Sequence, residues 1–415
     1  MNRRDFLNKT ASAGTLAWAG RLFSSALVSR ARTSKDNFDV AVVGAGVFGS
    51  WTAHFLNRAG QRVVLLDAYG PSNDRASSGG ESRIIRVGYG PNEIYTRWAQ
   101  RALGFWNELF TRRATPLFHR TGVLWICKPT DRYSLQTLTV LEKVGAKFER
   151  LSHADLAGRY PQIAVDDDAF GIFEPDSGVL MARRAVQAVV EEAVQSGVEY
   201  RAAEVIPPSG SGQVATLQLR DGTSVNARTY VFACGPWLPK LFPNLLGNRI
   251  VPSRQEVFFF GIPAGDLRFS PPNLPTWINL ADEYYGMPDL ENRGFKIAND
   301  AHGVPVDPDT MDRIASAEGL GSARAYLARR FPGLKDAPLM ESRVCQYENT
   351  SNGDFLIDRH RDFTNVWLVG GGSGHGFKHG PSLGEYAAGQ ILGKTPAEPR
   401  FSLATKEAIQ KRNVF

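Results

Sequence analysis

The stretch from residue 38 to residue 49 reads Phe38-Asp39-Val40-Ala41-Val42-Val43-Gly44-Ala45-Gly46-Val47-Phe48-Gly49. Its first half is a short apolar run, which predicts a buried strand that ends at the glycines. Helical spacing follows from 47 to 59, and an apolar run from 61 to 67 predicts a second strand. The stretch therefore opens a strand–helix–strand unit with a glycine-rich first turn.

An acidic residue closes this unit. Asp67 ends the second predicted strand, 18 residues after Gly49, near the place where a carboxylate meets a ribose hydroxyl. Glycines let backbone N–H groups approach a pyrophosphate, and the helix start adds a favourable dipole. The unit predicts a dinucleotide site formed by Gly44, Gly46, Val47, Phe48, Gly49 and Asp67. The alternative is a tight strand-to-helix turn that binds no ligand.

A second glycine-rich stretch lies near the other end of the chain. Cys345 sits in Arg343-Val344-Cys345-Gln346-Tyr347, and Gly370-Gly371-Gly372-Ser373-Gly374-His375-Gly376-Phe377-Lys378 follows it. A nucleotide-binding turn at one end and a thiol beside a second Gly-rich turn at the other indicate a chain built around a flavin. We expect Cys345 to anchor that cofactor covalently and Lys378 to bind a substrate carboxylate.

The net charge of +6 is concentrated at the N-terminus. Residues 1–32 hold six basic side chains and one acid, so the rest of the chain is nearly neutral. No later segment alternates basic and aromatic residues along one face, so the sequence argues against nucleic-acid binding.

The N-terminal segment 1–35 resembles a twin-arginine export signal. It begins Arg3-Arg4-Asp5-Phe6-Leu7-Asn8-Lys9, and a small, mildly apolar run follows from 10 to 20. The resemblance implies an export translocase as partner and a periplasmic or otherwise exported protein. Arg21 interrupts the apolar run, and the alternative is a disordered basic tail. A stable membrane span is not expected, because a span needs about 20 apolar residues.

The chain has three cysteines. In an oxidising compartment Cys127 and Cys234 could form a disulfide, although Cys234 follows a strand-like run and fits a small core residue better. No Cys and His spacing suggests a metal site.

The rest of the chain alternates between two kinds of segment. Helices are expected at 93–111, 135–145, 152–159, 182–196, 307–331 and 381–392, and strands at 121–127, 199–205, 230–235 and 366–369. A hairpin is expected around Asp221-Gly222, and an antiparallel sheet within 250–300. Segments 36–90, 178–235 and 340–395 are expected to form a cofactor domain, 91–177 and 236–339 a substrate domain, and 396–415 a C-terminal tail.

These motifs resemble the sarcosine oxidase-like branch of the D-amino-acid oxidase superfamily, which includes monomeric sarcosine oxidase, N-methyltryptophan oxidase and pipecolate oxidase. The resemblance covers about residues 36–395. It is strongest at Gly44 to Gly49, at Arg83-Ile84-Ile85-Arg86 with Tyr89, at Tyr284 through Lys296, and at Cys345 through Lys378. It implies an α/β fold in which a Rossmann-type, glutathione-reductase-like FAD-binding domain is interleaved with a substrate domain built on an antiparallel sheet.

The resemblance also implies a role for each matching residue. Cys345 would form a thioether to the flavin, Arg86 and Lys378 would clamp a carboxylate, and Lys296 would promote the reaction with dioxygen. Tyr285 and Tyr347 would form aromatic walls, and Arg83 would lie against the flavin. The cofactor shell would include Asp67, Val205, Gly372, Gly374, Gly376, Phe377 and Lys378. The alternatives are an inert buried cysteine, solvated arginines and a lysine on the surface.

The expected function is FAD-dependent oxidation of the C–N bond of a secondary or N-substituted amino acid to an imine. Dioxygen would be reduced to hydrogen peroxide, and the enzyme is expected to be a monomer. One alternative is a flavin dehydrogenase that passes electrons to a quinone or another carrier. A second alternative is a flavin-bearing binding protein without turnover.

Overall fold

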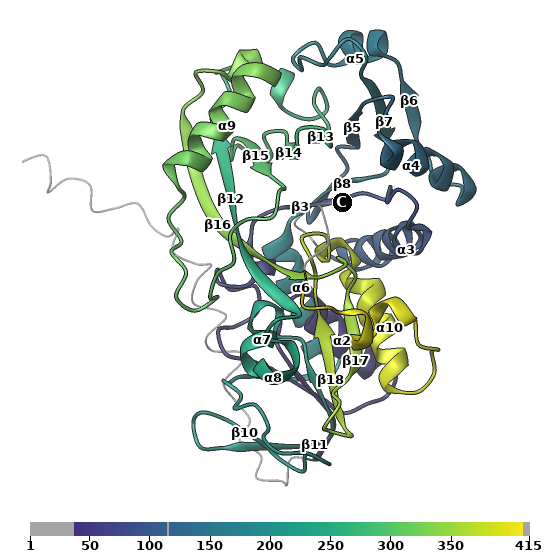
Figure 1. The fold of residues 1–415 in the computed structure, drawn as a ribbon, viewed down its shortest axis with the longest axis vertical. Coiled ribbons are helices and arrows are strands. Elements are labelled where there is room, and N and C mark those ends of the chain that lie inside the picture. The colour runs from purple at the N-terminus through teal and green to yellow at the C-terminus, as the bar shows by residue number, and fades with distance from the viewer. Residues whose placement is uncertain (1–36, 114–115, 410–415) are drawn as a thin grey trace, which may run out of the picture. The chain divides into compact units, whose positions relative to one another are not determined.

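The computed structural model describes residues 37–113 and 116–409. The segment for which an export signal is expected lies outside these residues. Figure 1 shows three sheets and the helices packed on them.

The first sheet has seven strands and contains the predicted strand–helix–strand unit. Five of its strands run parallel, the edge strand β17 is antiparallel to β18, and the short strand β10 pairs with β11. The order along the sheet is β17-β18-β11-β1-β2-β9. The bounds are β1 Asn37–Val43, β2 Val63–Asp67, β9 Glu199–Ala202, β10 Leu217–Gln218, β11 Ser224–Phe232, β17 Leu356–Arg359 and β18 Val366–Gly370.

Four helices pack together beside this sheet. They are α2 Val47–Arg58, α3 Glu93–Phe110, α6 Ala182–Gln195 and α10 Gly380–Ile391. Trp51 of α2 meets Trp106 of α3 edge to face, with ring centroids 5.1 Å apart, and both side chains are buried. Strands of a parallel sheet have two apolar faces, and these helices cover one of them.

The second sheet has eight strands in the order β16-β12-β15-β14-β13-β5-β7-β6. All neighbouring strands are antiparallel except β13 and β5. Helix α9 Ala317–Arg330 packs on it through Tyr326, which stacks on Trp277 at 5.7 Å. The bounds are β5 Val123–Cys127, β6 Glu149–Leu151, β7 Phe170–Glu174, β12 Ile250–Phe260, β13 Thr276–Asn279, β14 Tyr284–Met287, β15 Phe295–Asn299 and β16 Leu339–Thr350.

A small third sheet and several short helices complete the described chain. The third sheet has the order β3-β8-β4. Its strands are β3 Arg83–Ile85, β4 Phe118–His119 and β8 Gly178–Leu180, and the remaining helices are α4 Arg132–Lys143, α5 His153–Arg159, α7 Leu238–Leu241 and α8 Pro243–Leu246. Single 3-10 turns used below are η1 Ser77–Gly79, η2 Gly235–Trp237 and η5 Phe377–His379.

The antiparallel sheet within 250–300 and most expected helices are confirmed, but the expected helix 307–331 is wrong in its first half. The helix begins at Ala317, where Ser316 accepts a hydrogen bond from Gly319 N and caps it. Before that point Arg254 donates hydrogen bonds to the carbonyl oxygens of Asp312 and Ile314. These carbonyl oxygens therefore accept hydrogen bonds from a side chain of β12 and do not close a helical turn.

Two further strands differ from the sequence prediction. The segments expected as a hairpin arm and as a separate strand at 230–235 form the single strand β11, in which residues 226–229, between the two buried stretches, are exposed or half-buried. Cys345, for which no element was expected, lies in the long strand β16, which pairs with β12 along its whole length.

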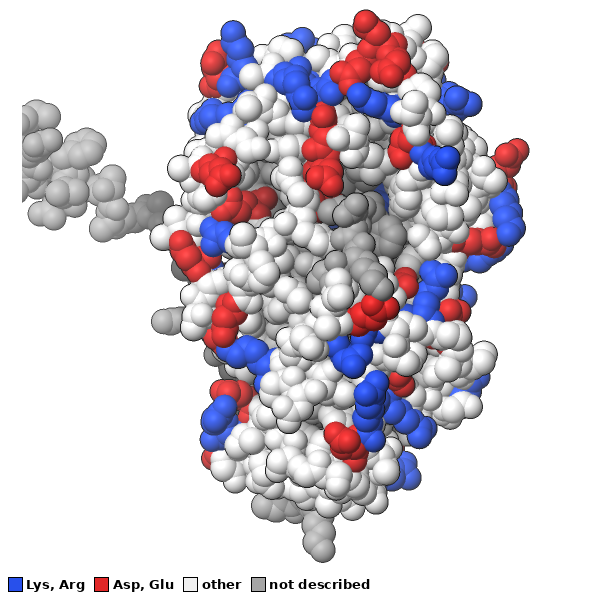
Figure 2. All heavy atoms as spheres, viewed as in Figure 1, with Lys and Arg blue, Asp and Glu red and all other residues white. Residues whose placement is uncertain are grey.

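Charged side chains of both signs are interleaved over the face shown in Figure 2. Among the described residues many charged side chains form ion pairs, such as Arg101 with Glu385 and Arg184 with Glu291. This face therefore offers no extended surface of one sign. Within residues 37–113 and 116–409 there is no helix whose length and apolar character suit a membrane crossing.

Candidate cofactor and substrate site

A cavity of about 400 Å³ lies against the first turn of the parallel sheet. Its wall includes the residues expected to bind the dinucleotide and residues from the C-terminal Gly-rich stretch. Among the predicted site residues that line it are Gly44, Gly46, Val47, Phe48, Asp67, Arg83, Val205, Tyr347, Gly372, Gly374, Gly376 and Phe377. The structure thus brings together segments that lie more than 300 positions apart in the sequence.

Gly44 and Gly49 allow the first turn to be this tight. Gly44 has a φ of 103°, and an added Cβ there would lie 2.4 Å from the carbonyl oxygen of Ala233. An added Cβ at Gly49, which lies outside the cavity wall, would lie 1.8 Å from the carbonyl oxygen of Gly44. Close packing of strand, turn and helix therefore requires both glycines.

Asp67 lies where the sequence places it, at the end of β2. Its Oδ2 accepts a hydrogen bond from Ala45 N at 2.7 Å, and its Oδ1 accepts one from Tyr69 N at 2.9 Å. Burial raises the pKa of Asp67. The carboxylate thus ties the first turn to β2 and borders the cavity.

Three polar atoms in the cavity wall have no hydrogen-bond partner in the described chain. They are Ser77 Oγ, Gln346 Oε1 and Glu348 Oε2. Each such buried atom costs about 1–3 kcal/mol when it is left unpaired. A ligand that brings polar groups along an elongated cavity would satisfy them, and the glycine-rich turn, Asp67 and these atoms together fit a dinucleotide such as FAD.

Cys345 and Arg83 meet beside this cavity. The Arg83 Nη2 donates hydrogen bonds to Cys345 Sγ at 3.1 Å and to the carbonyl oxygen of Ser77 at 2.8 Å. Burial acts against the charged guanidinium, but Cys345 and two tyrosines outweigh it and raise the pKa of Arg83. Arg83 is half-buried, and its hydrogen bonds to Cys345 and Ser77 show that it is not a fully solvated arginine.

Lys296 is buried, so the alternative of a surface lysine is wrong. Its side chain is 3% exposed, and Nζ donates hydrogen bonds to Ser82 O at 2.9 Å and to Ser82 Oγ at 3.1 Å. Burial, followed by the charge of Arg83, holds the pKa of Lys296 well below its usual value. Lys296, Cys345 and Arg83 all line a second cavity of about 330 Å³.

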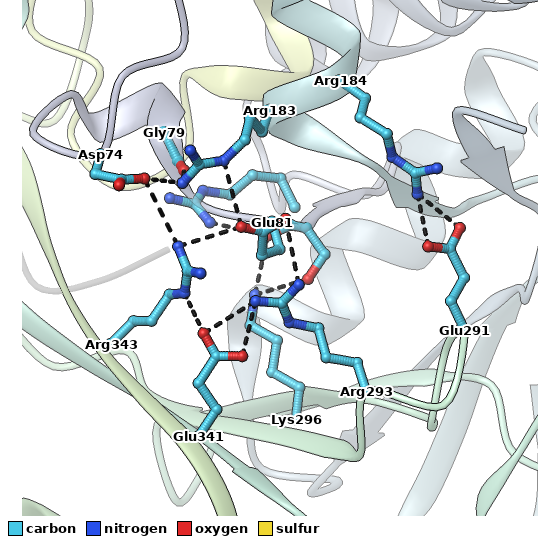
Figure 3. A network of polar contacts seen from close by, with 12 residues as sticks. Asp74, Gly79, Glu81, Arg183, Arg184, Glu291, Arg293, Lys296, Glu341 and Arg343 are labelled. Carbon is cyan, nitrogen blue, oxygen red and sulfur yellow. Dashed lines mark hydrogen bonds and ion pairs between the residues drawn. The ribbon is translucent and has the colours of Figure 1, made fainter. Parts of the chain in front are cut away.

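An ion-pair network borders the second cavity (Figure 3). Glu81 lies within 3.4 Å of Arg183, Arg293 and Arg343. Arg293 and Arg343 also pair with Glu341 on β16. Most of these side chains form ion pairs with more than one partner. The network therefore holds the loop before β3 against the second sheet.

Arg86 and Lys378 meet at the ring of Tyr89. The Arg86 Cζ lies 4.3 Å from the ring centroid, and Lys378 Nζ lies 5.3 Å from it. Lys378 Nζ also donates hydrogen bonds to the Tyr89 hydroxyl at 2.9 Å and to the carbonyl oxygen of His375 at 3.0 Å. Both cations are at least 94% shielded from water, so neither is a solvated charge.

Sequence reasoning assigned no role to Tyr89, His375 or His379, although all three surround this pair of cations. Nε2 of His379 lies 2.8 Å from the Tyr89 hydroxyl, and Nδ1 of His375 lies 3.3 Å from it. Burial, followed by Lys378, holds the pKa of His379 well below its usual value. His375 and His379 lie one and five residues beyond Gly374, on either side of Lys378 in the sequence, and this proximity to Lys378 was a usable signal.

The two predicted aromatic walls lie together. The Tyr347 hydroxyl donates a hydrogen bond to Asp300 Oδ1 at 2.9 Å. Burial, followed by Asp300, raises the pKa of Tyr285 to about 12. Asp300 therefore adds a carboxyl group to this aromatic wall.

Glu174, which belongs to no recognised motif, binds the backbone that follows Arg86. It is 1% exposed. Its Oε2 accepts hydrogen bonds from Val87 N at 2.7 Å and Ser177 Oγ at 2.6 Å, and its Oε1 accepts them from Gly88 N at 3.0 Å and Trp125 Nε1 at 2.9 Å. Arg86 donates to the carbonyl oxygen of Gly88 and stacks on Trp125 at 4.7 Å.

All three cysteines are free. The alternative disulfide between Cys127 and Cys234 is therefore wrong. Burial raises the pKa of Cys127 to about 12. Cys127 and Cys234 behave as small core residues.

The fold and the cavity define a flavin-binding α/β enzyme, and the comparisons agree. A family model described as FAD dependent oxidoreductase matches residues 39–390. Monomeric sarcosine oxidase of Bacillus sp. (strain NS-129) is 31% identical over 91% of this chain and 99% of that protein. N-methyl-L-tryptophan oxidase of Salmonella heidelberg (strain SL476) is 30% identical over 87% of this chain and 96% of that protein.

This chain belongs to the FAD-dependent oxidoreductase family and, within it, to the branch of these two oxidases. Solved structures agree on the fold. The fructosyl peptide oxidase of E. terrenum aligns with a TM-score of 0.77 at 20% identity, over 92% of this chain and 97% of that one. The L-proline dehydrogenase of P. horikoshii aligns with a TM-score of 0.77 at 18% identity, over 89% and 98%. The predicted α/β fold class is confirmed.

Proposed function

We propose that this enzyme oxidises the C–N bond of a secondary or N-substituted amino acid to an imine, with dioxygen reduced to hydrogen peroxide. The observation that carries the proposal is the buried pair Arg86 and Lys378, held at the ring of Tyr89. Two cations shielded from water attract an anion strongly, because the local dielectric constant is low. A substrate carboxylate would bind to both cations.

The relatives indicate the type of amine. The names of the two curated oxidases refer to sarcosine and N-methyl-L-tryptophan, both of which are N-methyl amino acids. The aromatic wall of Tyr285 and Tyr347 would contact the side of the substrate that carries the nitrogen. Asp300, bonded to Tyr347, would accept a hydrogen bond from the N–H of the substrate amine at this position.

The residues of this chain bind and orient the substrate. FAD, when bound, supplies the redox chemistry by accepting a hydride equivalent and delivering electrons to dioxygen. Arg86 and Lys378 would hold the carboxylate so that the C–H bond next to nitrogen faces the cofactor cavity. The neutral amine needs no protein base, and the imine product hydrolyses after release.

We also propose that Cys345 forms a thioether with the flavin and that Lys296 promotes the reaction with dioxygen. Cys345 Sγ and Lys296 both line the second cavity, next to Arg83. Forming the C–S bond would break the thiol S–H bond and one C–H bond of the flavin methyl group and leave two electrons on the flavin, which dioxygen would then accept. A buried ammonium stabilises charge that develops on dioxygen. The roles of both residues rest on their matched positions and on this shared cavity.

Export through the twin-arginine route and a monomeric state complete the proposal. Both rest on the sequence: the paired arginines of segment 1–35 and the resemblance to the branch. Fractionation of cells that express the full chain, and light scattering of the purified protein, would test them separately.

A panel of amines read by two signals tests the proposed reaction. Sarcosine, proline, pipecolate, N-methyl aromatic amino acids and glycated amino acids would be mixed with the enzyme without oxygen, and flavin bleaching recorded. For each amine that bleaches the flavin, peroxide would be measured per turnover in air. Peroxide in equal yield to imine supports an oxidase. Rapid dye reduction without peroxide would show a dehydrogenase, and absence of bleaching by every amine would contradict the substrate class.

A further inference from the structure

Glu348 is a buried acid in the cofactor cavity to which no role has been assigned so far. It lies on β16, three residues after Cys345, and is 6% exposed. Its Oε1 accepts a hydrogen bond from Gly372 N at 3.1 Å, whereas Oε2 has no partner. A buried carboxyl with one unsatisfied oxygen destabilises the protein unless a ligand completes its hydrogen bonds.

Three glycines surround this carboxyl. An added Cβ at Gly235 would lie 3.8 Å from Oε2, and one at Gly370 would lie 3.4 Å from it. An added Cβ at Gly372 would lie 3.1 Å from Oε1. Gly235, Gly372 and Glu348 all line the 400 Å³ cavity. Because Gly235 and Gly372 carry no side chain, backbone forms the cavity wall next to this carboxyl.

We propose that Glu348 is a cofactor-binding residue whose Oε2 forms a hydrogen bond with FAD between the turns at Gly235 and Gly372. The inference rests on the FAD dependence of the family and not on the proposed substrate. An enzyme that binds FAD but oxidises none of the amines above would leave it intact.

Glu348 acts as the donor in this hydrogen bond. Burial raises the pKa of Glu348 to about 7, although the N–H groups of Gly372 and Gly371 act in the opposite direction. FAD carries negative phosphates, and a nearby anion favours the neutral carboxyl further. The neutral form has an O–H on the free oxygen, which can donate to an oxygen or nitrogen of the cofactor.

Among the described residues, Glu348 and Asp67 are the two acids in this cavity wall whose pKa values burial raises. Cys234, at the start of η2, has its pKa raised by burial and stays neutral near pH 7. Pro252 lies opposite Glu348 on β12, η1 contributes serines and a glycine, and the turn at 370–374 contributes glycines and Ser373. The same cavity is also lined by the charged groups of Arg83, Arg220, Lys240, Asp67, Glu204 and Asp309.

FAD affinity should therefore depend on pH. Below about pH 7 Glu348 is already neutral in the free protein, so FAD binds without taking up a proton. Above about pH 7 the free carboxyl is ionised, and binding must take up a proton, so affinity falls by up to about tenfold per pH unit.

The test measures FAD binding, not turnover. In a Cys345→Ala background the flavin is not linked covalently, and flavin-free protein can be titrated with FAD by calorimetry at about pH 6 and about pH 8. Glu348→Ala should bind FAD about tenfold more weakly at the lower pH. At about pH 6, Glu348→Gln should bind FAD with the affinity of its parent. Its affinity should not fall at about pH 8, because the amide donates a hydrogen bond at both pH values.

Glu256→Gln is the matched control. Glu256 lies on β12, the strand beside β16, and outside the cavity, where it pairs with Arg254 at 2.9 Å. This variant should keep the affinity and the pH dependence of the parent. Circular dichroism of each flavin-free variant would establish that it is folded.

Two outcomes would overturn the proposal. The first is parental affinity in both Glu348→Ala and Glu348→Gln. The second is a pH dependence that survives in Glu348→Gln, which would assign it to Asp67, whose pKa burial also raises. If Glu348→Ala does not fold, Glu348→Gln alone decides. None of these readings requires an amine substrate, so failure of the proposed function remains distinguishable.

Discussion

Replacing Glu174 by glutamine should destabilise the enzyme and weaken substrate binding together. Four donors point at its two oxygens, from Val87 N, Gly88 N, Trp125 Nε1 and Ser177 Oγ. A glutamine has one acceptor oxygen. In the more favourable of its two amide orientations, the glutamine oxygen accepts from Gly88 N and Trp125 Nε1. The Ser177 hydroxyl then rotates and accepts a hydrogen bond from the amide NH2 group.

Val87 N then remains unpaired in a buried place, at a cost of about 1–3 kcal/mol. The other hydrogen bonds lose the strength that an ionised acceptor gives them. The sum predicts a loss of about 2–4 kcal/mol in the free energy of unfolding. Urea unfolding of the FAD-loaded protein, followed by circular dichroism, measures this difference.

The same change should raise the KM for an amino acid substrate about tenfold, because Arg86 depends on Gly88 and Trp125 for its position. Glu199→Gln is the control, because Glu199 forms an exposed pair with Arg201 and such pairs contribute about 0–1 kcal/mol. A loss of stability below about 0.5 kcal/mol for Glu174→Gln, with KM unchanged, would refute the reasoning.

Three further predictions concern the residues of the site. Cys345→Ala should release its yellow pigment on acid precipitation, whereas the unchanged protein should retain it; pigment lost from both would contradict the covalent link. Lys378→Met should raise KM by about 10- to 100-fold through loss of a charged hydrogen bond, with FAD content unchanged, and an unchanged KM would remove Lys378 from the clamp. The reaction of the reduced enzyme with dioxygen should slow as pH rises, because burial lowers the pKa of Lys296 and its charge is lost well below the usual pH. Stopped-flow reoxidation should show that Lys296→Met is slow at every pH, and a rate equal to that of the parent would exclude this role.

Local patterns determined a large part of the fold. The apolar run before Gly44, the glycines and Asp67 specify a strand, a tight turn and a helix within about 30 residues. Each of these features depends on neighbours in the sequence, so β1, α2 and β2 could be placed without the structure. The prediction of a helix over 307–316 was wrong for the opposite reason. Carbonyl oxygens of this segment accept hydrogen bonds from Arg254, which lies on a strand distant in the sequence.

The motifs also selected the residues of the site, but only the tertiary structure decided which of them meet. Arg86 and Lys378 are almost 300 positions apart and share the ring of Tyr89. Glu174 and Glu348 stand in strands that look like ordinary sheet, and their importance comes from donors or cavities supplied by other segments. Hydrogen bonding and burial of a charged group depend on every segment that surrounds it, and packing of the whole chain is what brings those segments together.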